Sequence, residues 1–137
     1  MKAQQAGARE IRLREMSKAD MPRIMALEQE LFPEDAWTPE MFAGEFTQPP
    51  SRRLYLVAEE GDALIGYAGM MFTGGSQADV VTLAVDPAHW GQGTGTALLS
   101  ALVDEAGGRG YTEIGIRRGY YQPAGVDAVV MRKVLAR

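Results

Sequence analysis

The pattern of hydrophobic and polar positions in the first third of the chain predicts one strand and two helices. Residues 10–16 alternate apolar and charged side chains, which is the period of a half-buried strand. Apolar residues then recur every three or four positions from 21 to 31, and this spacing predicts a helix. Ser17, followed by Asp20 three residues later, forms a capping-box sequence in front of that helix. Thr38 followed by proline predicts the start of a second helix, which ends at the next pair of prolines.

The middle of the chain changes to strand-like patterns. Apolar runs at 54–59, 64–72 and 79–85 are separated by short segments that contain glycine, which predicts three antiparallel strands joined by turns. Small and apolar residues from 94 to 106 then return to helical spacing. The predicted order is therefore a strand, two helices, a three-strand meander and a further helix.

A glycine-alternating loop lies between the third strand of the meander and the helix that follows it. Glycines at 91, 93 and 95 let backbone N–H groups converge, and the helix adds its own free N–H groups and the positive end of its dipole. Such a cradle suits a pyrophosphate. A nucleotide-hydrolysing P-loop is excluded because no lysine follows Gly95. A dinucleotide fingerprint is excluded because Thr96 stands where its third glycine is needed.

Length and composition indicate one globular domain. We expect it to span residues 10–137, behind a flexible N-terminal segment, 1–9. The absence of cysteine and the single histidine leave no basis for a disulfide or a metal site, so no metal is expected. The longest apolar run, Ala63–Phe72, is shorter than the ~20 residues of a membrane span, and no signal peptide is visible. The sequence therefore predicts a cytoplasmic protein without a membrane partner.

Charge is distributed unevenly along the chain. Residues 1–108 carry 8 basic and 16 acidic side chains, whereas residues 109–137 carry 6 and 2. Acidic residues gather between 28 and 45, where they form either a solvated helix face or an entrance that attracts a cationic peptide or amine. Neither part interleaves basic and aromatic residues as nucleic-acid binders do, so we expect no nucleic-acid partner.

The glycine loop resembles motif A of the GCN5-related N-acetyltransferases, whose Gln/Arg-x-x-Gly-x-Gly/Ala loop grips the pyrophosphate of acetyl-CoA. Gly93 and Gly95 occupy the two glycine positions, whereas Trp90 stands where the family supplies Gln or Arg. Residues 111–121 and 127–131 resemble the final hairpin of the RimI-like subgroup, the ribosomal-protein alanine N-terminal acetyltransferases. The resemblance covers nearly the whole chain. It implies that family's fold class, an α/β (α+β) fold in which helices flank a mixed central sheet.

The resemblance also implies which residues bind acetyl-CoA and the acceptor. The strand before the loop would pair with the pantetheine arm, the loop N–H groups would hold the pyrophosphate, and the Trp90 indole would stack on the adenine or pantetheine side. Aromatic residues would line a peptide groove, although plain core packing explains Phe32 and Trp37 equally well. The expected cofactor-binding residues are Leu83, Ala84, Val85, Trp90, Gly91, Gln92, Gly93, Thr94, Gly95 and Thr96. The expected substrate-binding residues are Phe32, Trp37, Tyr120 and Tyr121.

One strand and one helix of the resembled family have no counterpart in this sequence. In the family they lie between the motif A helix and the final hairpin, and they carry a Glu as proposed general base and a Tyr as proposed general acid. Here Ala106 is followed almost directly by Tyr111, so roughly two dozen residues are absent and the catalytic residues stay unassigned. Without that strand, the edge of residues 81–85 is expected to be open.

Three explanations account for the missing segment near residues 106–112. It is deleted, it is replaced by exchange of strands within a homodimer, or it is omitted from the sequence. We favour the omission, because the elements on both sides have undamaged patterns.

Two classes of function follow from these observations. The first is an acetyl-CoA-dependent N-acetyltransferase acting on the N-terminal α-amine of a protein, a ribosomal protein in the resembled subgroup. An enzyme that acetylates a small amine would share the same cofactor site. The second class is a non-catalytic CoA-binding module, because the expected acid and base are absent. Turnover of acetyl-CoA with a short Ala-starting peptide separates the two classes, and we expect little or no activity from a monomer that lacks both groups.

Overall fold

A computed structural model describes residues 10–73, 75–116 and 131–132 of the chain, so the predicted flexible segment 1–9 lies outside the described residues. The strands are β1 (Ile11–Glu15), β2 (Arg53–Glu60), β3 (Ala63–Phe72), β4 (Gln77–Val85), β5 (Glu113–Ile116) and β6 (Met131–Arg132). The helices are α1 (Met21–Leu31), α2 (Pro39–Phe46) and α3 (Thr94–Gly108), with short 3-10 turns η1 (Lys18–Asp20), η2 (Pro50–Arg52) and η3 (Pro87–His89).

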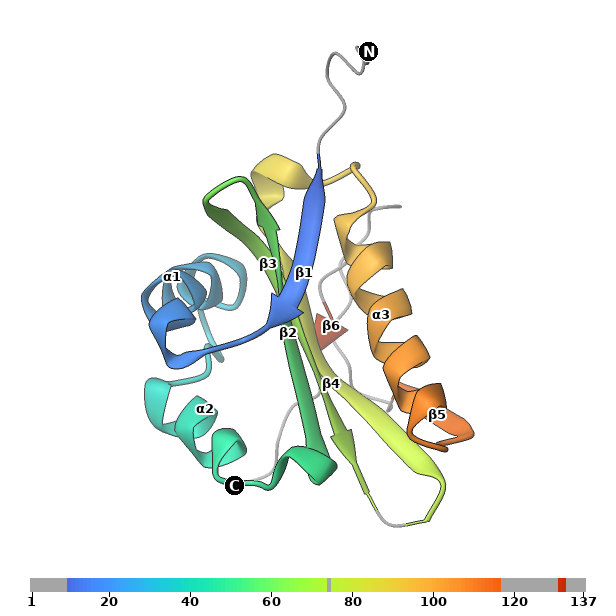
Figure 1. The fold of residues 1–137 in the computed structure, drawn as a ribbon. Helices are drawn as coiled ribbons and strands as arrows, with labels where there is room; N and C mark the ends of the chain where they lie inside the picture. The colour runs from blue at the N-terminus through green and yellow to red at the C-terminus, as the bar shows by residue number, and fades with distance from the viewer. Residues whose placement is uncertain (1–9, 74, 117–130, 133–137) are drawn as a thin grey trace, which may run out of the picture.

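One mixed sheet forms the middle layer of the molecule, with helices on both of its faces (Figure 1). The strands lie in the order β1-β2-β3-β4-β5, and β6 pairs with β4. Neighbours from β1 to β4 are antiparallel, whereas β5 is parallel to β4. Helices α1 and α2 cover one face of the sheet and α3 covers the other. The mixed fold predicted from the sequence is confirmed.

Two hydrophobic clusters fill the space between the sheet and its helices. On the α3 face, Leu98 and Leu102 pack against side chains of the central strands. On the opposite face, Ile24 and Leu27 of α1 and Phe42 of α2 pack against the other side of the same strands. Successive side chains of a strand point to opposite faces, so β4 contributes to both clusters and is buried along almost its whole length.

The first two helices begin at the capping residues that the sequence indicates. The Asp20 carboxylate accepts a hydrogen bond from the Ser17 N–H at 2.8 Å, as in a capping box. Thr38 Oγ1 accepts from the Met41 N–H at 3.1 Å, and Pro39 occupies the first turn of α2. Thr38 thus caps α2 itself, whereas Ser17 stands before η1, the 3-10 turn that runs directly into α1, and its own side chain makes no cap hydrogen bond.

The C-terminal segments pair differently from the expected hairpin. β5 runs parallel to residues 77–80 of β4, and β6 runs antiparallel to Thr82 and Leu83 of the same strand. Within the described residues, β5 and β6 do not pair with each other, and residues 117–130 lie outside them. The connection from β4 through α3 to β5 is a strand–helix–strand crossover, the kind of connection that joins parallel strands of one sheet. The expected open edge of β4 is therefore wrong at Thr82 and Leu83.

Helix α3 continues into β5 through a short hydrogen-bonded turn. The Tyr111 N–H donates to Ala106 O at 3.0 Å, and the Thr112 N–H donates to Ser76 O at 3.0 Å. β5 then pairs with β4 of the same chain. Deletion, exchange and omission of the missing segment all stay open as explanations. Intact mass spectrometry of the purified protein tests these explanations, since a deletion predicts 14.9 kDa and an omitted segment predicts a larger mass.

An ion-pair cluster joins β1, η1 and β2. Arg14 donates to both carboxylate oxygens of Asp20, at 3.0 and 2.8 Å, and to Glu59 at 2.9 Å. The hydrogen bonds from Arg14 hold the pKa of the Asp20 carboxyl below its ordinary value of 3.8. A carboxyl whose pKa is lowered by folding stabilises the fold above its unfolded pKa, and this contribution is lost as the pH falls through the folded pKa.

We therefore expect Asp20→Asn to lower the free energy of unfolding by about 1 kcal/mol at pH 7, because a charge-assisted bond at a half-exposed arginine is lost. The difference from the unsubstituted chain should begin to shrink as the pH falls below 3.8, where the Asp20 carboxyl of the unfolded chain becomes protonated, and should vanish below the lower pKa of the folded state. Urea unfolding at pH 7 and at pH 3 measures both values. Asp104→Asn on the exposed side of α3 is the control, and equal losses for the two variants at pH 7 would contradict the role of the cluster.

Within the ranges that the structure describes, no helix combines the length and apolar character that crossing a membrane requires. In the same ranges, no group of three or more His, Cys, Asp or Glu side chains is arranged to hold a metal ion.

Candidate active site

The loop between β4 and α3 needs glycine for its backbone conformation. Gly91 has φ 82° and Gly93 has φ 83°, both in the left-handed region that other residues rarely adopt. A Cβ added at either position would meet no atom within 4 Å, so space is not the constraint there. Gly95 lies in the first turn of α3 and is buried. The glycines at 91 and 93 thus determine how the chain turns into α3, whereas the sequence suggested that they clear space for the amides.

This turn leaves a row of backbone N–H groups without acceptors at the start of α3. The Ala97 N–H closes the first helical bond to Gly93 O at 2.9 Å. The N–H groups of Thr94, Gly95 and Thr96 therefore have no partner within the helix, and no side chain of the described residues caps them. Thr94 is also buried, and its hydroxyl oxygen has no hydrogen-bond partner among the described residues. Free N–H groups at the positive end of a helix dipole are the groups that bind anions in proteins, and binding of an anion here stays a prediction.

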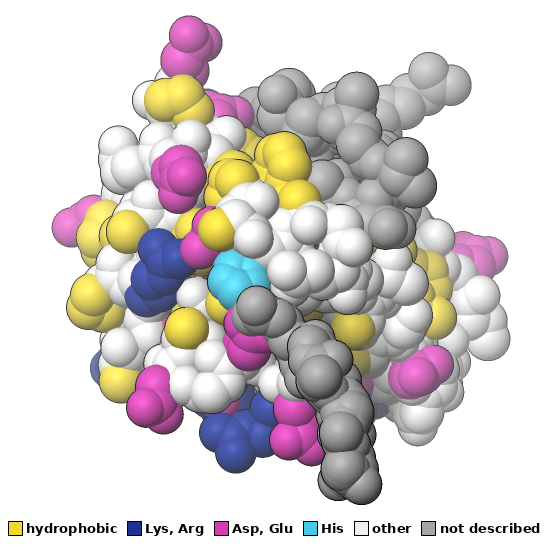
Figure 2. All heavy atoms as spheres, turned by 90° about the horizontal axis from the view of Figure 1, so that it is seen from above, with side chains coloured by type: hydrophobic (Ala, Val, Ile, Leu, Met, Phe, Trp, Pro, Cys, Tyr) yellow, Lys and Arg dark blue, Asp and Glu magenta, His cyan; other side chains and the backbone are white. Residues whose placement is uncertain are grey.

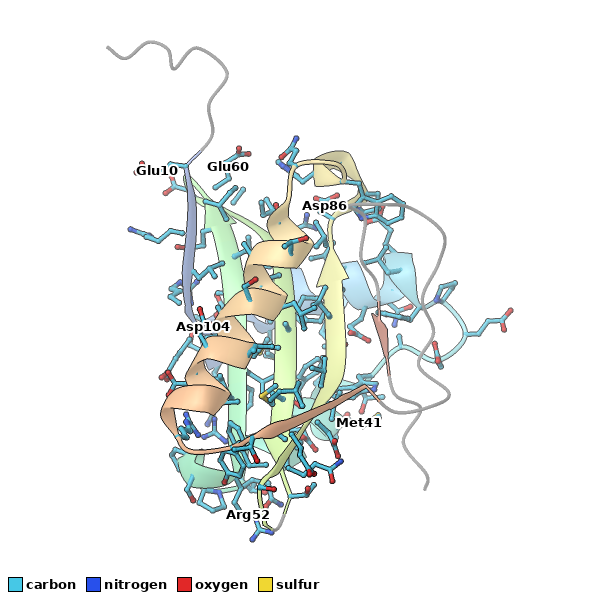
Figure 3. The ribbon with its side chains drawn as sticks, turned by 90° about the vertical axis from the view of Figure 1, so that its right-hand side faces the viewer. Glu10, Met41, Arg52, Glu60, Asp86 and Asp104 are labelled. Carbon is cyan, nitrogen blue, oxygen red and sulfur yellow. The ribbon has the colours of Figure 1, made fainter. Side chains whose placement is uncertain are left out.

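Contacts with α1 and with the β2–β3 hairpin hold this loop in place. Asp86 follows β4 directly and accepts a hydrogen bond from Arg23 of α1 at 2.5 Å. His89 Nδ1 lies 3.3 Å from Gln92 Oε1 and 3.5 Å from Glu60 Oε1. Figure 3 shows Glu60 and Asp86 at the same end of the sheet. A loop that is held in the absence of ligand presents its N–H groups at a smaller entropic cost on binding.

The loop offers backbone groups to a ligand in place of cationic side chains. Residues 91–96 contain no Lys or Arg. Figure 2 looks down on this end of the molecule and shows, beside the single histidine in cyan, a white area of backbone and uncharged polar atoms. An anion at the start of α3 would therefore be held mainly by N–H groups and the helix dipole.

Trp90 connects the loop to the end of β4. Its indole N–H donates to Val85 O at 2.7 Å, and its half-buried ring packs against both hydrophobic clusters. Because an indole has a single donor, only the ring face remains for a ligand. Stacking of Trp90 on the cofactor stays a prediction, and the structure adds an anchoring role that the sequence did not indicate.

Trp90→Phe should lower the free energy of unfolding by about 1–2 kcal/mol, because part of the ring packing is kept while Val85 O loses its donor. Urea unfolding followed by circular dichroism, without any ligand, measures this difference. An unchanged free energy of unfolding would mean that water satisfies the carbonyl and that the indole bond does not hold the loop.

The β4 edge expected to pair with a pantetheine arm is partly occupied. β6 pairs with Thr82 and Leu83, and the Trp90 indole holds Val85 O. Pairing of the arm with Leu83, Ala84 and Val85 stays a prediction. In this conformation it requires the arm to replace β6 at Leu83 and the indole at Val85.

A β-bulge marks the place where β4 changes partner. Across the β3–β4 pair, Gly69 lies opposite Thr82 and Met70 lies opposite Val80, so Val81 is an extra residue. β5 pairs with β4 only as far as Val80, and β6 begins opposite Thr82 and Leu83. β5 thus pairs with β4 before the bulge, and β6 pairs with β4 after it.

The expected peptide-groove residues before α2 lie in the core. Phe32 and Trp37 are each 3% exposed and belong to the cluster between the sheet and helices α1 and α2. The fully buried Glu28 carboxylate accepts hydrogen bonds from the Trp37 N–H at 2.8 Å and from the Tyr67 hydroxyl. These bonds fix the segment between α1 and α2. Phe32 and Trp37 therefore pack as core residues here, and their contact with a substrate stays a prediction.

The described residues do not assign a catalytic acid or base. Tyr120 and Tyr121 lie outside them. Tyr111 stacks on Phe72 with ring centroids 4.5 Å apart, and Glu113 is exposed at the start of β5. Neither is held by a partner in the manner of a positioned acid or base.

Comparison with known proteins identifies the family. The acetyltransferase (GNAT) family matches residues 13–124 of the chain. The chain belongs to the GNAT family of acetyltransferases. It is 34% identical to the N-alpha-acetyltransferase RimI of Mycobacterium tuberculosis (strain ATCC 25618 / H37Rv), over 86% of this chain and 89% of that protein. The family and this relative show that the chain is an N-acetyltransferase.

Solved structures show the same fold. The ribosomal-protein-S18-alanine N-acetyltransferase of Escherichia coli superposes with a TM-score of 0.67 at 21% identity, covering 89% of each chain. The PaiA N-acetyltransferase of Thermoplasma acidophilum, solved with coenzyme A, superposes with a TM-score of 0.64 at 16% identity, covering 91% of this chain and 99% of that one.

The length of the alignment with the mycobacterial relative indicates how many of its positions have no counterpart in this chain. It spans 142 positions, whereas 86% of this chain supplies only about 118 residues. About two dozen positions of the GNAT relative therefore have no counterpart here, the size expected from one strand, one helix and their connections.

Three buried polar residues of α1 and β4 were not predicted from the sequence to be buried. Glu28, Asp79 and Thr82 are all buried in otherwise apolar surroundings. The signal was a polar side chain at a position where the helical or strand pattern demands an apolar one, as in the run from Ala78 to Val85. The sequence pattern does not show, however, whether such a side chain is buried, because its burial depends on how the helices pack on both faces of the sheet.

Proposed function

We propose that this chain transfers the acetyl group of acetyl-CoA to the N-terminal α-amine of a protein. The observation that carries the proposal is the row of free N–H groups at the start of α3, in a chain 34% identical to an N-alpha-acetyltransferase over most of its length. An acetylated α-amine is the product named by that relative, and coenzyme A is bound in a structural neighbour.

The chain would hold acetyl-CoA through two sets of backbone groups. The pyrophosphate would be bound by the N–H groups of the loop and the first turn of α3, helped by the Thr94 hydroxyl. The pantetheine arm would lie along the edge of β4 at Leu83, Ala84 and Val85. These interactions orient the thioester and bring it to a fixed place beside the sheet, which is how positioning contributes to the rate.

Acetyl transfer in such a site needs the acceptor amine in its neutral form. The amine nitrogen attacks the thioester carbon, a C–N bond forms, and the carbonyl oxygen becomes an oxyanion. Collapse of this intermediate breaks the C–S bond, and the proton of the new ammonium neutralises the departing thiolate. The chain would contribute binding, orientation and N–H donors near the oxyanion, because no acid or base is assigned among its described residues.

The acceptor that fits the proposal is a protein with an N-terminal alanine, for example a ribosomal protein, met in the cytoplasm. The E. coli neighbour is named for alanine of ribosomal protein S18, and this supports testing such a peptide first. Glu28 is buried and takes no part, but the exposed acidic residues Glu30, Glu34, Asp35 and Glu40 would favour the approach of a basic, ribosomal-type segment. A homodimer with exchanged strands would be a further partner, and light scattering of the pure chain tests for it.

The test is acetylation of a short Ala-starting peptide. Mass spectrometry should show a single acetyl group on the α-amine after incubation with acetyl-CoA. A peptide with a blocked N-terminus and a free lysine is the control for acceptor class, and a free aminoglycoside is the control for small amines. Acetylation of either control in place of the Ala-starting peptide would overturn the proposed acceptor.

A non-catalytic CoA-binding module is the second candidate, favoured by the absence of an assigned acid and base. Calorimetry with CoA separates the two candidates. Binding of CoA without any acetylation of the peptide supports the module, whereas binding together with acetylation supports the enzyme.

A further inference from the structure

One hydroxyl in the middle of the sheet has no hydrogen-bond partner among the described residues. Thr82 lies in β4 with no exposed surface, and its Oγ1 is unpaired. A buried hydroxyl without a partner destabilises a fold, whereas a valine of nearly the same shape would not. The polar residue at this position is therefore more easily explained by a ligand that pairs with it than by packing.

The register of the sheet decides which face this hydroxyl is on. Thr82 lies directly opposite Gly69 of β3. The Cβ that Gly69 lacks would point into the ring of Tyr55, which belongs to the cluster under α1 and α2. Directly opposed residues of antiparallel strands carry their side chains on the same face. Thr82 is thus on the α1/α2 face, the face of Phe32 and Trp37, and away from α3.

The order of groups along β4 places Thr82 next to the reacting atoms of the proposed reaction. The pyrophosphate site lies beyond the end of β4, and the arm would run back along Val85, Ala84 and Leu83. The thioester end of an arm that starts at the loop then arrives at Thr82, beside the bulge at Val81. Release of the β4 edge by β6, which the arm requires at Leu83, would also free the backbone edge at Thr82, since β6 pairs with both residues.

We propose that Thr82 is a catalytic residue whose Oγ1 accepts a hydrogen bond from an N–H of the acceptor amine. The inference rests on the proposed function and adds to it the group that orients the nucleophile. A hydroxyl oxygen offers two lone pairs, so it binds a primary amine without taking its proton. The nitrogen lone pair is then directed at the thioester carbon, and acyl transfer proceeds with the proton balance given above.

The test compares Thr82→Val, which removes the hydroxyl, with Thr82→Ser, which keeps it. The kcat/KM for acetylation of an Ala-starting peptide should fall about tenfold in the valine variant and stay within about twofold in the serine variant. The affinity of both variants for CoA should be unchanged, because the pyrophosphate and the arm contact other groups. The melting temperature of the valine variant should rise by about 3 °C, since an unpaired buried hydroxyl is removed.

Thr112→Val, at an exposed threonine before β5, is the matched control and should change neither value. A valine variant that acetylates the peptide as fast as the unsubstituted chain overturns the role of Thr82 and leaves the proposed function standing. An unsubstituted chain that binds CoA and acetylates no amine overturns the proposed function, and the role of Thr82 falls with it.

Discussion

Replacing Gly93 by Asp should weaken the binding of CoA by about 100-fold, or nearly 3 kcal/mol. Gly93 precedes the first turn of α3 with φ 83°, a conformation that costs an L-residue about 1–2 kcal/mol. The carboxylate would also stand beside the free N–H groups of Thr94 and Gly95, where it competes with the pyrophosphate and repels it. Gly93→Ala separates the two causes, because it adds the strain without the charge, and it should weaken binding about tenfold.

Isothermal calorimetry with CoA measures both variants against the unsubstituted chain. Gly107→Asp is the matched control, because Gly107 lies near the far end of the same helix, where an added Cβ meets no atom within 4 Å and φ is not left-handed. It should bind CoA with unchanged affinity. If Gly93→Asp also binds CoA normally, the start of α3 is not the pyrophosphate site.

Acetyl transfer by this chain should be slow and should depend on pH through the acceptor alone. Proton transfer by a placed acid or base typically contributes about 10²–10⁴-fold, and we expect kcat to lie lower by a factor of that size than in a GNAT enzyme that has both groups. Without an enzymic base, only the neutral amine reacts. The rate should therefore rise about tenfold per pH unit and level off near the pKa of an α-amine, about 8.

Single-turnover rates between pH 6 and pH 9.5, with saturating acetyl-CoA and an Ala-starting peptide, measure this profile. A peptide with an N-terminal residue of lower amine pKa is the control, because the point of levelling should shift with the acceptor. A profile that levels off near pH 6, whatever the acceptor, would reveal a base in the chain and contradict the expectation.

Local structure followed closely from the sequence. The capping residues Ser17 and Thr38 mark the starts of the first two helices, and the alternation of apolar runs with glycine-containing turns marks β2, β3 and β4. These features depend on a few neighbouring residues, so a sequence pattern is enough to predict them. The glycine loop belongs to the same class, since φ at Gly91 and Gly93 is a local property.

The pairing of the C-terminal segments did not follow from the sequence. Similarity to a family hairpin predicted that the segments around Ile114 and Met131 pair with each other, whereas both pair with β4. Pairing is a competition between all edges of the sheet. Within the described residues, β5 and β6 both lie along the edge of β4 that β3 does not occupy.

The sequence by itself determined the order of the main elements, the glycine loop before α3 and the family resemblance, because each depends on short runs of residues. Only the tertiary structure decided that Trp90 is bonded to Val85, that Phe32 and Trp37 are buried, and that Thr82 is an unpaired hydroxyl on the α1/α2 face. These outcomes depend on which strands are neighbours and which face each side chain takes. Residues far apart in the chain set both, through the packing of the sheet between its helices.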